Sequence, residues 1–138
     1  MTASSEDRSA KQSVDFNDIN TYFRSENVLN AWLMFDFKQK KIRPTHYSIR
    51  TKPSNRGAEH LKEWVIEGSN DKYNWKLLDS RKDIEVLNSK SAFHKFEVQE
   101  NLEQNEFYQY IRIRQTGQNW CLDNYLNISG LEYFGSIK

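Results

Sequence analysis

Cysteine is nearly absent from this sequence, since Cys121 is the only one among 138 residues. A lone cysteine excludes an internal disulfide and leaves no second thiol for a metal-binding pair. Disulfides belong to oxidising compartments, so a chain without one is expected in the cytoplasm. An extracellular location stays open, because the chain could be a domain excised from a longer protein.

Proline, glycine and long apolar runs are also scarce. Two prolines and five glycines separate this composition from that of low-complexity or disordered chains. No stretch approaches the length of a membrane span, and no charged segment followed by an apolar one marks a leader. The net charge of +1 provides no overall field that would attract nucleic acid. We therefore expect one globular domain over residues 1–138, a monomeric module within a larger chain.

Aromatic residues and alternating patterns are what the sequence has in quantity. Aromatics make up 14% of the chain, so a few bulky side chains must carry the core. Alternation with period two, typical of half-buried strands, predicts strands at 31–38, 42–52, 61–69, 75–82, 93–98, 106–116 and 128–134. A short strand and a long loop to about Asn30 precede them. Short strands separated by turns, without helical periodicity, predict an all-β, antiparallel β-sandwich.

The same alternation predicts which side chains face the core and which face solvent. Inward positions are Tyr47, Ile49, Trp64, Ile66, Ile111 and Ile113. Arg112 and Arg114 then point outward, and Arg112 is expected to pair with Glu132 on an adjacent terminal strand. Arg114 lies nearer a loop and is the better ligand candidate, because its planar fork can hold vicinal hydroxyls or a carboxylate.

Charge is uneven along the chain. The segment from Lys38 to Lys62 holds eight basic residues against one acid, Glu59. Such a run is either a set of solvated turns or a basic rim for an anionic partner.

Catalytic signatures are missing from the sequence. Nucleophilic catalysis needs a nucleophile, a base and an orienting group. The histidines, His46, His60 and His94, are scattered, and no nucleophile elbow, phosphate-cradling glycine loop or His-Glu-x-x-His motif occurs. We expect a binding domain and no enzyme.

Several motifs, taken in order, carry a family resemblance. Residues 64–71, WVIEGSND, followed by Trp75, resemble the central signature of discoidin domains, the coagulation factor V/VIII type C family. Residues 110–114, YIRIR, and 131–135, LEYFG, resemble the penultimate and terminal strands of that family, and residues 18–23, DINTYF, resemble its early turn. The motifs follow the order and spacing of the family and cover almost the whole chain.

The resemblance implies a galactose-binding-like jelly roll of about eight strands, with ligands held by loops at one end. Those loops would be residues 15–30, 52–60 and 116–125. The ligand candidates in or beside them are Tyr22, Arg24, Asn55, Arg56, His60, Arg114, Asn119, Trp120 and Asn124. Such side chains beside an aromatic platform suit a sugar, but they are also ordinary in polar loops. Trp120 either stacks on a ligand or plugs the end of the core.

A calcium ion is a further implication of the resemblance. Many carbohydrate-binding relatives hold one at the early turn, and Asp18, Thr21 and Glu132 match those positions. The usual earlier aspartate is replaced by Phe16, which removes an oxygen ligand from an ion that takes about six to eight. We therefore prefer the alternative that Asp18 and Thr21 only fold the turn. No cofactor is expected, and calcium is kept as a hypothesis.

The resemblance also bears on the partner. The two terminal cysteines of extracellular members are absent, so the chain is similar to intracellular multidomain members and to microbial carbohydrate-binding modules. We expect a non-catalytic module that forms part of a larger intracellular protein and docks a protein partner. The alternative is a carbohydrate-binding module. Membrane binding is disfavoured, because the end loops lack adjacent exposed leucine or phenylalanine pairs apart from Tyr22–Phe23.

Overall fold

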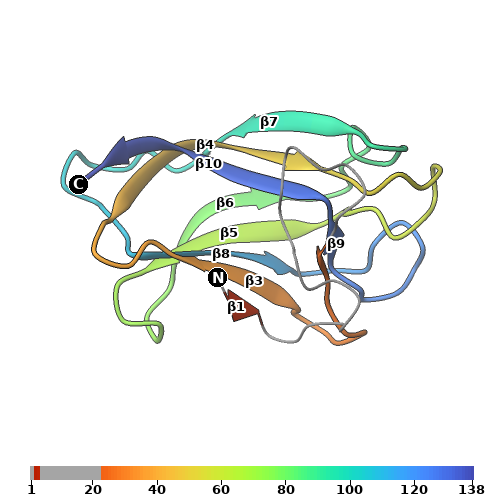
Figure 1. Cartoon of the computed structure of the whole chain (residues 1–138), viewed down its shortest axis with the longest axis horizontal. Coiled ribbons are helices and arrows are strands. Elements are labelled where there is room, and N and C mark those ends of the chain that lie inside the picture. The colour runs from red at the N-terminus through yellow and green to blue at the C-terminus, as the bar shows by residue number, and fades with distance from the viewer. Residues whose placement is uncertain (1, 4–22) are drawn as a thin grey trace.

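Two antiparallel sheets packed face to face form a sandwich in the part of the chain that the computed structural model describes, residues 2–3 and 23–138 (Figure 1). The strands are β1 (Thr2–Ala3), β2 (Phe23–Arg24), β3 (Trp32–Asp36), β4 (Ile42–Arg50), β5 (Trp64–Ser69), β6 (Lys76–Arg81), β7 (Phe93–Glu97), β8 (Tyr110–Gln115), β9 (Asn127–Ile128) and β10 (Gly130–Ile137). One sheet has the order β1-β3-β8-β5-β6 and the other β10-β4-β7, while β2 and β9 pair separately. The predicted all-β, antiparallel sandwich is confirmed.

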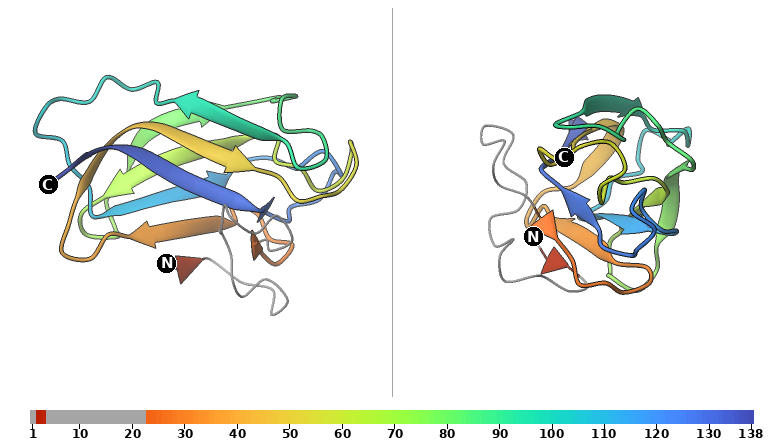
Figure 2. Two further views of the ribbon diagram at one scale, coloured as in Figure 1. Left: turned by 45° about the horizontal axis from the view of Figure 1, so that its top comes forward. Right: turned by 90° about the vertical axis from the view of Figure 1, so that its right-hand side faces the viewer.

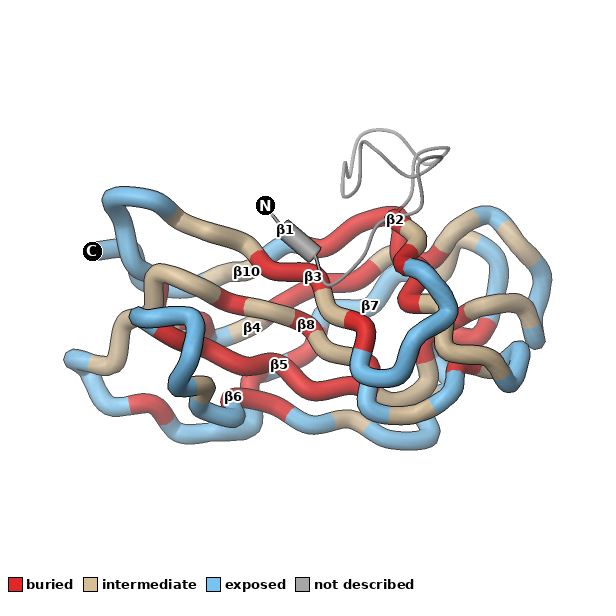
Figure 3. Tube along the Cα trace, turned by 90° about the horizontal axis from the view of Figure 1, so that it is seen from below, coloured by how far each residue is buried: buried red, intermediate tan, exposed pale blue. Residues whose placement is uncertain are grey.

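The core lies between the two sheets, where the alternating side chains meet. All six positions predicted to face inward are fully buried: Tyr47, Ile49, Trp64, Ile66, Ile111 and Ile113. Each large apolar side chain buried in this way contributes about 1.5–3 kcal/mol. Figure 3 shows buried positions running along β3, β5 and β8, with exposed positions in the loops and on the edge strand β7. No helix long and apolar enough to cross a membrane occurs in the described part of the chain.

Several strand boundaries differ from the predicted ones. The segment expected as one strand at 106–116 is in the five-stranded sheet only from Tyr110, because Tyr108 instead bridges to Ile42 of the other sheet. The run expected at 61–69 enters the sheet at Trp64. The last run is divided at Ser129, whose N–H donates to the carbonyl oxygen of Arg50. Each difference arises where the chain crosses from one sheet to the other.

The sheet order overturns one predicted ion pair. Within the described strands, β10 pairs with β4 alone, and Glu132 lies opposite Ser48. Arg112 lies on β8, in the other sheet, between β3 and β5. The predicted pairing of Arg112 with Glu132 is therefore wrong, because strands near one another in sequence here belong to different layers.

Candidate ligand-binding loop end

Loops converge at one end of the sandwich, as the resemblance implied. The Trp120 N–H donates to the His60 carbonyl oxygen at 3.1 Å, and the Asn124 N–H donates to Asn27 Oδ1 at 2.7 Å. A fourth loop, which was not predicted, joins them, since Trp120 Nε1 donates to the carbonyl oxygen of Ile84 at 2.9 Å. We call residues 25–31, 51–63, 82–92 and 116–126 the loop end. It faces the viewer in the right-hand panel of Figure 2.

Arg24, a ligand candidate on β2, lies in a cluster of charges beneath these loops. Its guanidinium carbon is 3.6 Å from the centre of the Tyr125 ring. Its Nε and Nη2 donate to the two carboxylate oxygens of Glu59 at 3.1 and 3.2 Å, and Lys52 Nζ lies 3.6 Å from the same carboxylate. Burial raises the pKa of the Glu59 carboxyl, but hydrogen bonds from Arg24 and Asn127 lower it more, so this pKa lies below its ordinary value. The Arg24 fork is thus occupied by a carboxylate of the same chain.

Three further candidates shape or border the 51–63 loop. His60 is fully buried, and its Nε2 lies 2.8 and 2.9 Å from the carbonyl oxygens of Ser54 and Asn55. Arg56 is exposed and donates to Glu85 Oε2 at 2.9 Å. The Asn55 side chain is exposed. Of the three, His60 holds the loop together from inside, while Asn55 and Arg56 reach the surface.

Asn119 and Asn124 fix the 116–126 loop. Asn119 is fully buried, and its Nδ2 donates to Asp123 Oδ1 at 2.6 Å and to the Tyr125 carbonyl oxygen at 2.9 Å. Its Oδ1 accepts the N–H of Cys121 at 2.9 Å. Asn124 joins the neighbouring loop through its own backbone N–H. These contacts hold the loop in its conformation.

Trp120 closes the end of the core. Besides the bond from its Nε1 to Ile84, its ring has Lys62 Nζ 4.5 Å from the ring centre. The residue is half-buried. The Trp120 ring is thus in contact with other residues of its own chain.

Arg114 lies on β8, on the outer face of the five-stranded sheet. Its Nε and Nη2 donate to the carboxylate of Glu67 at 2.9 and 3.2 Å, and its Nη1 donates to Asn30 Oδ1 at 2.8 Å. Arg112 Nε donates to the same carboxylate at 2.9 Å, and its guanidinium carbon stands 3.9 Å from the centre of the Trp75 ring. Burial raises the pKa of the Glu67 carboxyl, but the hydrogen bonds from Arg114 and Arg112 lower it below its ordinary value. Glu67, which sequence reasoning missed, is the partner of both arginines.

Exposed apolar side chains at the loop end were also missed. Leu29 is 77% exposed and Leu122 69%. Val28, next to Leu29, and Val86, in the 82–92 loop, are also exposed. Leu122 has a φ of 65°, a left-handed conformation that is rare for a leucine. Val28 and Leu29 form an adjacent exposed apolar pair that the sequence analysis did not identify. Phe23, which was expected to be exposed, is buried.

The proposed metal ligands are only partly described. Asp18 and Thr21, like the ligand candidate Tyr22, lie outside the described residues. Glu132 is exposed on β10. The described residues contain no group of three or more histidine, cysteine, aspartate or glutamate side chains that could hold a metal ion. Calcium binding remains a prediction.

The basic segment from Lys38 to Lys62 does not form one surface. It is divided by β4, which at about 3.3 Å per residue spans about 30 Å. The turn that holds Lys38 lies at one end of the sandwich, and Arg56 lies in the loop end at the other (Figure 1). The basic residues of this segment therefore lie at both ends of the sandwich and along β4.

Comparisons with known proteins place this arrangement in a family. The chain is 29% identical over 108 residues to the E3 ubiquitin-protein ligase Ufd4 of Drosophila melanogaster, a match that covers 78% of this chain and 4% of that protein. Among solved structures, the CBM32 of AlyQ, in complex with 4,5-unsaturated mannuronic acid, gives a TM-score of 0.72 at 16% identity, covering 98% of this chain and 93% of that one. The family 32 CBM of C. perfringens NanJ, in complex with galactose, gives 0.71 at 13% identity, covering 99% and 91%. These structures share the fold.

A family model described as the F5/8 type C domain matches residues 1–125, most of the sequence. The motifs quoted from the sequence, the sandwich and this match agree, and the chain belongs to the F5/8 type C, or discoidin, domain family.

Proposed function

We propose that this chain is a non-catalytic binding module that docks a protein partner through the apolar side chains of its loop end. The observation that carries the proposal is a contrast in exposure. Leu29 and Leu122 are 77% and 69% exposed, whereas the polar candidates His60 and Asn119 are fully buried. Covering water-exposed leucines with a partner is favourable, by about 25 cal/mol per Å² of apolar area buried. Membership in the F5/8 type C family supports a binding module.

The geometry is less suited to a sugar than the sequence suggested. A sugar site needs polar groups free to bond hydroxyls and an aromatic face free to stack. Asn119 and His60 are buried in loop contacts, and the Arg24 fork is filled by Glu59. Lys62 stands over the Trp120 ring. These contacts favour a protein partner over a glycan.

The sequence relative supports the same choice. It is an E3 ubiquitin-protein ligase, so a protein is its substrate, and this chain corresponds to 4% of its length. We infer that this module belongs to an intracellular protein and brings a partner to it. The lone cysteine is consistent with that compartment.

Carbohydrate binding is the second candidate, favoured by one specific feature. Arg24 stacks on Tyr125 at the loop end, where its side chain is 26% exposed. The structures that share the fold include modules in complex with galactose and with 4,5-unsaturated mannuronic acid. A glycan that displaced Glu59 from Arg24 could use this guanidinium and the Tyr125 ring.

A pair of matched variants tests the proposed function. Leu29→Ser with Leu122→Ser removes the exposed leucines of the loop end, while Leu77→Ser removes an exposed leucine, 46% exposed, on β6. Partners are identified by cross-linking in cells that express the protein, and each is then purified and titrated by calorimetry. We expect the loop-end double variant to bind at least tenfold more weakly and Leu77→Ser to bind as the wild type does. Equal binding by all three proteins would refute docking at the loop end.

A glycan array decides between the two candidates. We expect the wild type to retain no glycan. A glycan signal that is lost in Tyr125→Ala and kept in the double leucine variant would replace protein docking with carbohydrate binding.

A further inference from the structure

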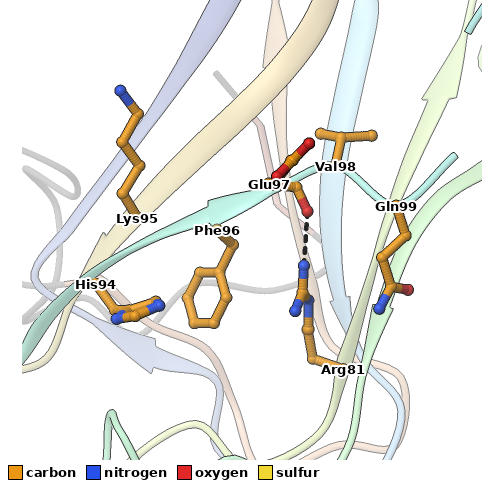
Figure 4. A pocket seen from close by; sticks show the side chains of 7 residues that line it. All are labelled: Arg81, His94, Lys95, Phe96, Glu97, Val98 and Gln99. Carbon is orange, nitrogen blue, oxygen red and sulfur yellow. Dashed lines mark hydrogen bonds between the residues drawn. The ribbon is translucent and has the colours of Figure 1, made fainter. Parts of the chain in front are cut away.

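A cleft of about 350 Å³ opens along the side of the sandwich, between the free edges of β6 and β7. Its walls include Arg81 from β6 and His94 and Phe96 from β7 (Figure 4). The His94 ring lies 4.6 Å from the Phe96 ring, and the guanidinium carbon of Arg81 lies 5.1 Å from that ring. The cleft is separate from the loop end and contains none of the ligand candidates predicted from the sequence.

Arg81 is fixed in this cleft by a hydrogen-bonded chain from the core. Trp64 Nε1 donates to Tyr47 Oη at 3.0 Å, and Tyr47 Oη donates to Asp79, which is buried. Asp79 Oδ2 accepts from Arg81 Nε at 2.9 Å, and Arg81 Nη2 donates to the Glu97 carbonyl oxygen at 2.6 Å. A guanidinium held in this way loses little freedom when it binds a further acceptor.

One nitrogen of this guanidinium, Nη1, donates no hydrogen bond to the described residues. In the part of the chain that the structure describes, the hydrogen bonds of Arg81 come from Nε and Nη2, and none comes from Nη1. Side chains alternate along β7, so Lys95 and Glu97 point to the opposite face from His94 and Phe96, and Figure 4 shows Lys95 turned away from the cleft. The cleft, which Lys95 and Glu97 also line, therefore presents a cation with spare donors.

The backbone of β7 adds a second binding element. Ala92 and Val98 bond to β4 through their backbone, because Thr51 donates to the Ala92 carbonyl oxygen and Val98 donates to the Thr45 carbonyl oxygen. Backbone direction alternates in an antiparallel strand. The N–H and C=O of Lys95 thus face the free edge, as the Glu97 carbonyl oxygen that Arg81 reaches also does.

We propose that this cleft binds a short, extended acidic peptide by strand addition to β7. The peptide backbone pairs with the N–H and C=O of Lys95, and a glutamate or aspartate carboxylate accepts from Arg81 Nη1. The rings of His94 and Phe96 form the wall beside that side chain. A strand-like donor and acceptor pair beside an anchored guanidinium suits a peptide better than a sugar, which has no such backbone.

Titration of the isotope-labelled chain with two peptides, followed by NMR, tests the proposal. The probe is the acetylated, amidated peptide Thr-Val-Glu-Val-Thr, and the control has glutamine in place of glutamate. We expect saturable shifts at the Lys95 amide with the glutamate peptide and binding about tenfold weaker with the glutamine peptide, because a charge-assisted bond is lost. No saturation, or equal affinity for both peptides, would overturn the proposal.

Three variants separate the two binding elements. Lys95→Pro removes the N–H that faces the free edge, and Lys95→Gln keeps it, so the first should bind at least tenfold more weakly than the second. Arg81→Gln is combined with Asp79→Asn, so that no carboxylate is left buried without its partner, and this protein should no longer distinguish the two peptides. Lys40→Gln, in the distant turn between β3 and β4, controls for loss of a positive charge and should bind as the wild type does. If the double variant does not fold, the comparison of the two peptides on the wild type still decides the role of the carboxylate.

Discussion

Glu67 organises the outer face of the five-stranded sheet. Its carboxylate is 11% exposed and accepts hydrogen bonds from Arg112 on the same register row and from Arg114 two positions along β8. The arginines therefore remain beside the sheet, and Arg114 reaches Asn30 of the loop end from there. A carboxylate shared by two cations contributes more to stability than a single surface ion pair does, because removing it leaves both cations without that partner.

Replacing Glu67 with glutamine should destabilise the protein by about 2 kcal/mol, since charge-assisted hydrogen bonds are lost to a group that is mostly buried. The pKa of Glu67 is lowered in the folded state, so its contribution is present above the ordinary glutamate value and is lost as the pH falls through the folded value. Urea unfolding at pH 7 and pH 3 measures both effects, and the loss should shrink at pH 3. Glu132→Gln is the matched control and should change the free energy of unfolding by less than about 0.5 kcal/mol. An equal loss of stability in both variants would contradict the assignment of Glu67, rather than Glu132, as the partner of Arg112.

Tyr133 carries a buried hydroxyl with no hydrogen-bond partner in the described structure. Its ring packs against Phe35 with the ring centres 5.3 Å apart. Burial raises the pKa of the Tyr133 phenol. Because an unsatisfied buried hydroxyl costs about 1–3 kcal/mol, Tyr133→Phe should raise the free energy of unfolding by about 1 kcal/mol. Urea unfolding followed by fluorescence checks this, and a clear loss of stability would show that the hydroxyl has a partner.

At the scale of elements, Asn119 determines the shape of the 116–126 loop. Asn119→Ala removes an amide that bonds both side-chain and backbone groups of its own loop. We expect amide hydrogen exchange to accelerate at least tenfold at Cys121, whose N–H loses its acceptor, while Ile113 in β8 exchanges as before. Exchange measured by NMR on the folded protein separates this local effect from global unfolding. Equal acceleration at both positions would mean that the loop and the sheet open together.

The positions of the strands could be predicted from the sequence far better than the order in which they pair in the sheets. Period-two alternation depends only on which face of a strand is buried, so Tyr47, Ile49 and Ile113 were correctly placed. Sheet order depends on long-range pairing, which local patterns do not contain, and Arg112 was therefore given the wrong partner. The convergence of the end loops came from the family resemblance, whereas the internal bonds of Asn119 and the exposure of Leu29 depend on the exact loop path.

At the scale of the whole molecule, the proposals divide the surface into two regions. The loop end presents exposed leucines, and the side cleft presents an anchored guanidinium beside a strand edge. Apolar docking is insensitive to salt, whereas a carboxylate bound to Arg81 is weakened by it. A single partner that used both regions would therefore show a salt dependence removed by the Arg81 and Asp79 changes and an affinity reduced by the leucine changes.

The dependence of stability on pH should also be a property of the whole molecule. Carboxyls whose pKa is lowered by folding are Asp36, Glu59, Glu67, Asp71 and Glu106. Their contribution is complete above the unfolded values near about 4 and is lost as the pH falls through the folded values. Tyrosines whose pKa is raised by folding are Tyr47, Tyr108 and Tyr133, and burial is the main cause in each.

The tyrosine contribution is complete below the unfolded value of about 10 and is lost at higher pH, as unfolded tyrosines release protons that the folded ones retain. We therefore expect the free energy of unfolding to be level between about pH 5 and pH 9 and to fall on both sides. Urea unfolding from pH 2.5 to pH 11 measures the profile, and Tyr133→Phe should make its alkaline side shallower. A sharp maximum at the isoelectric point, near 7.8, would mean that net charge, rather than these individual groups, governs stability.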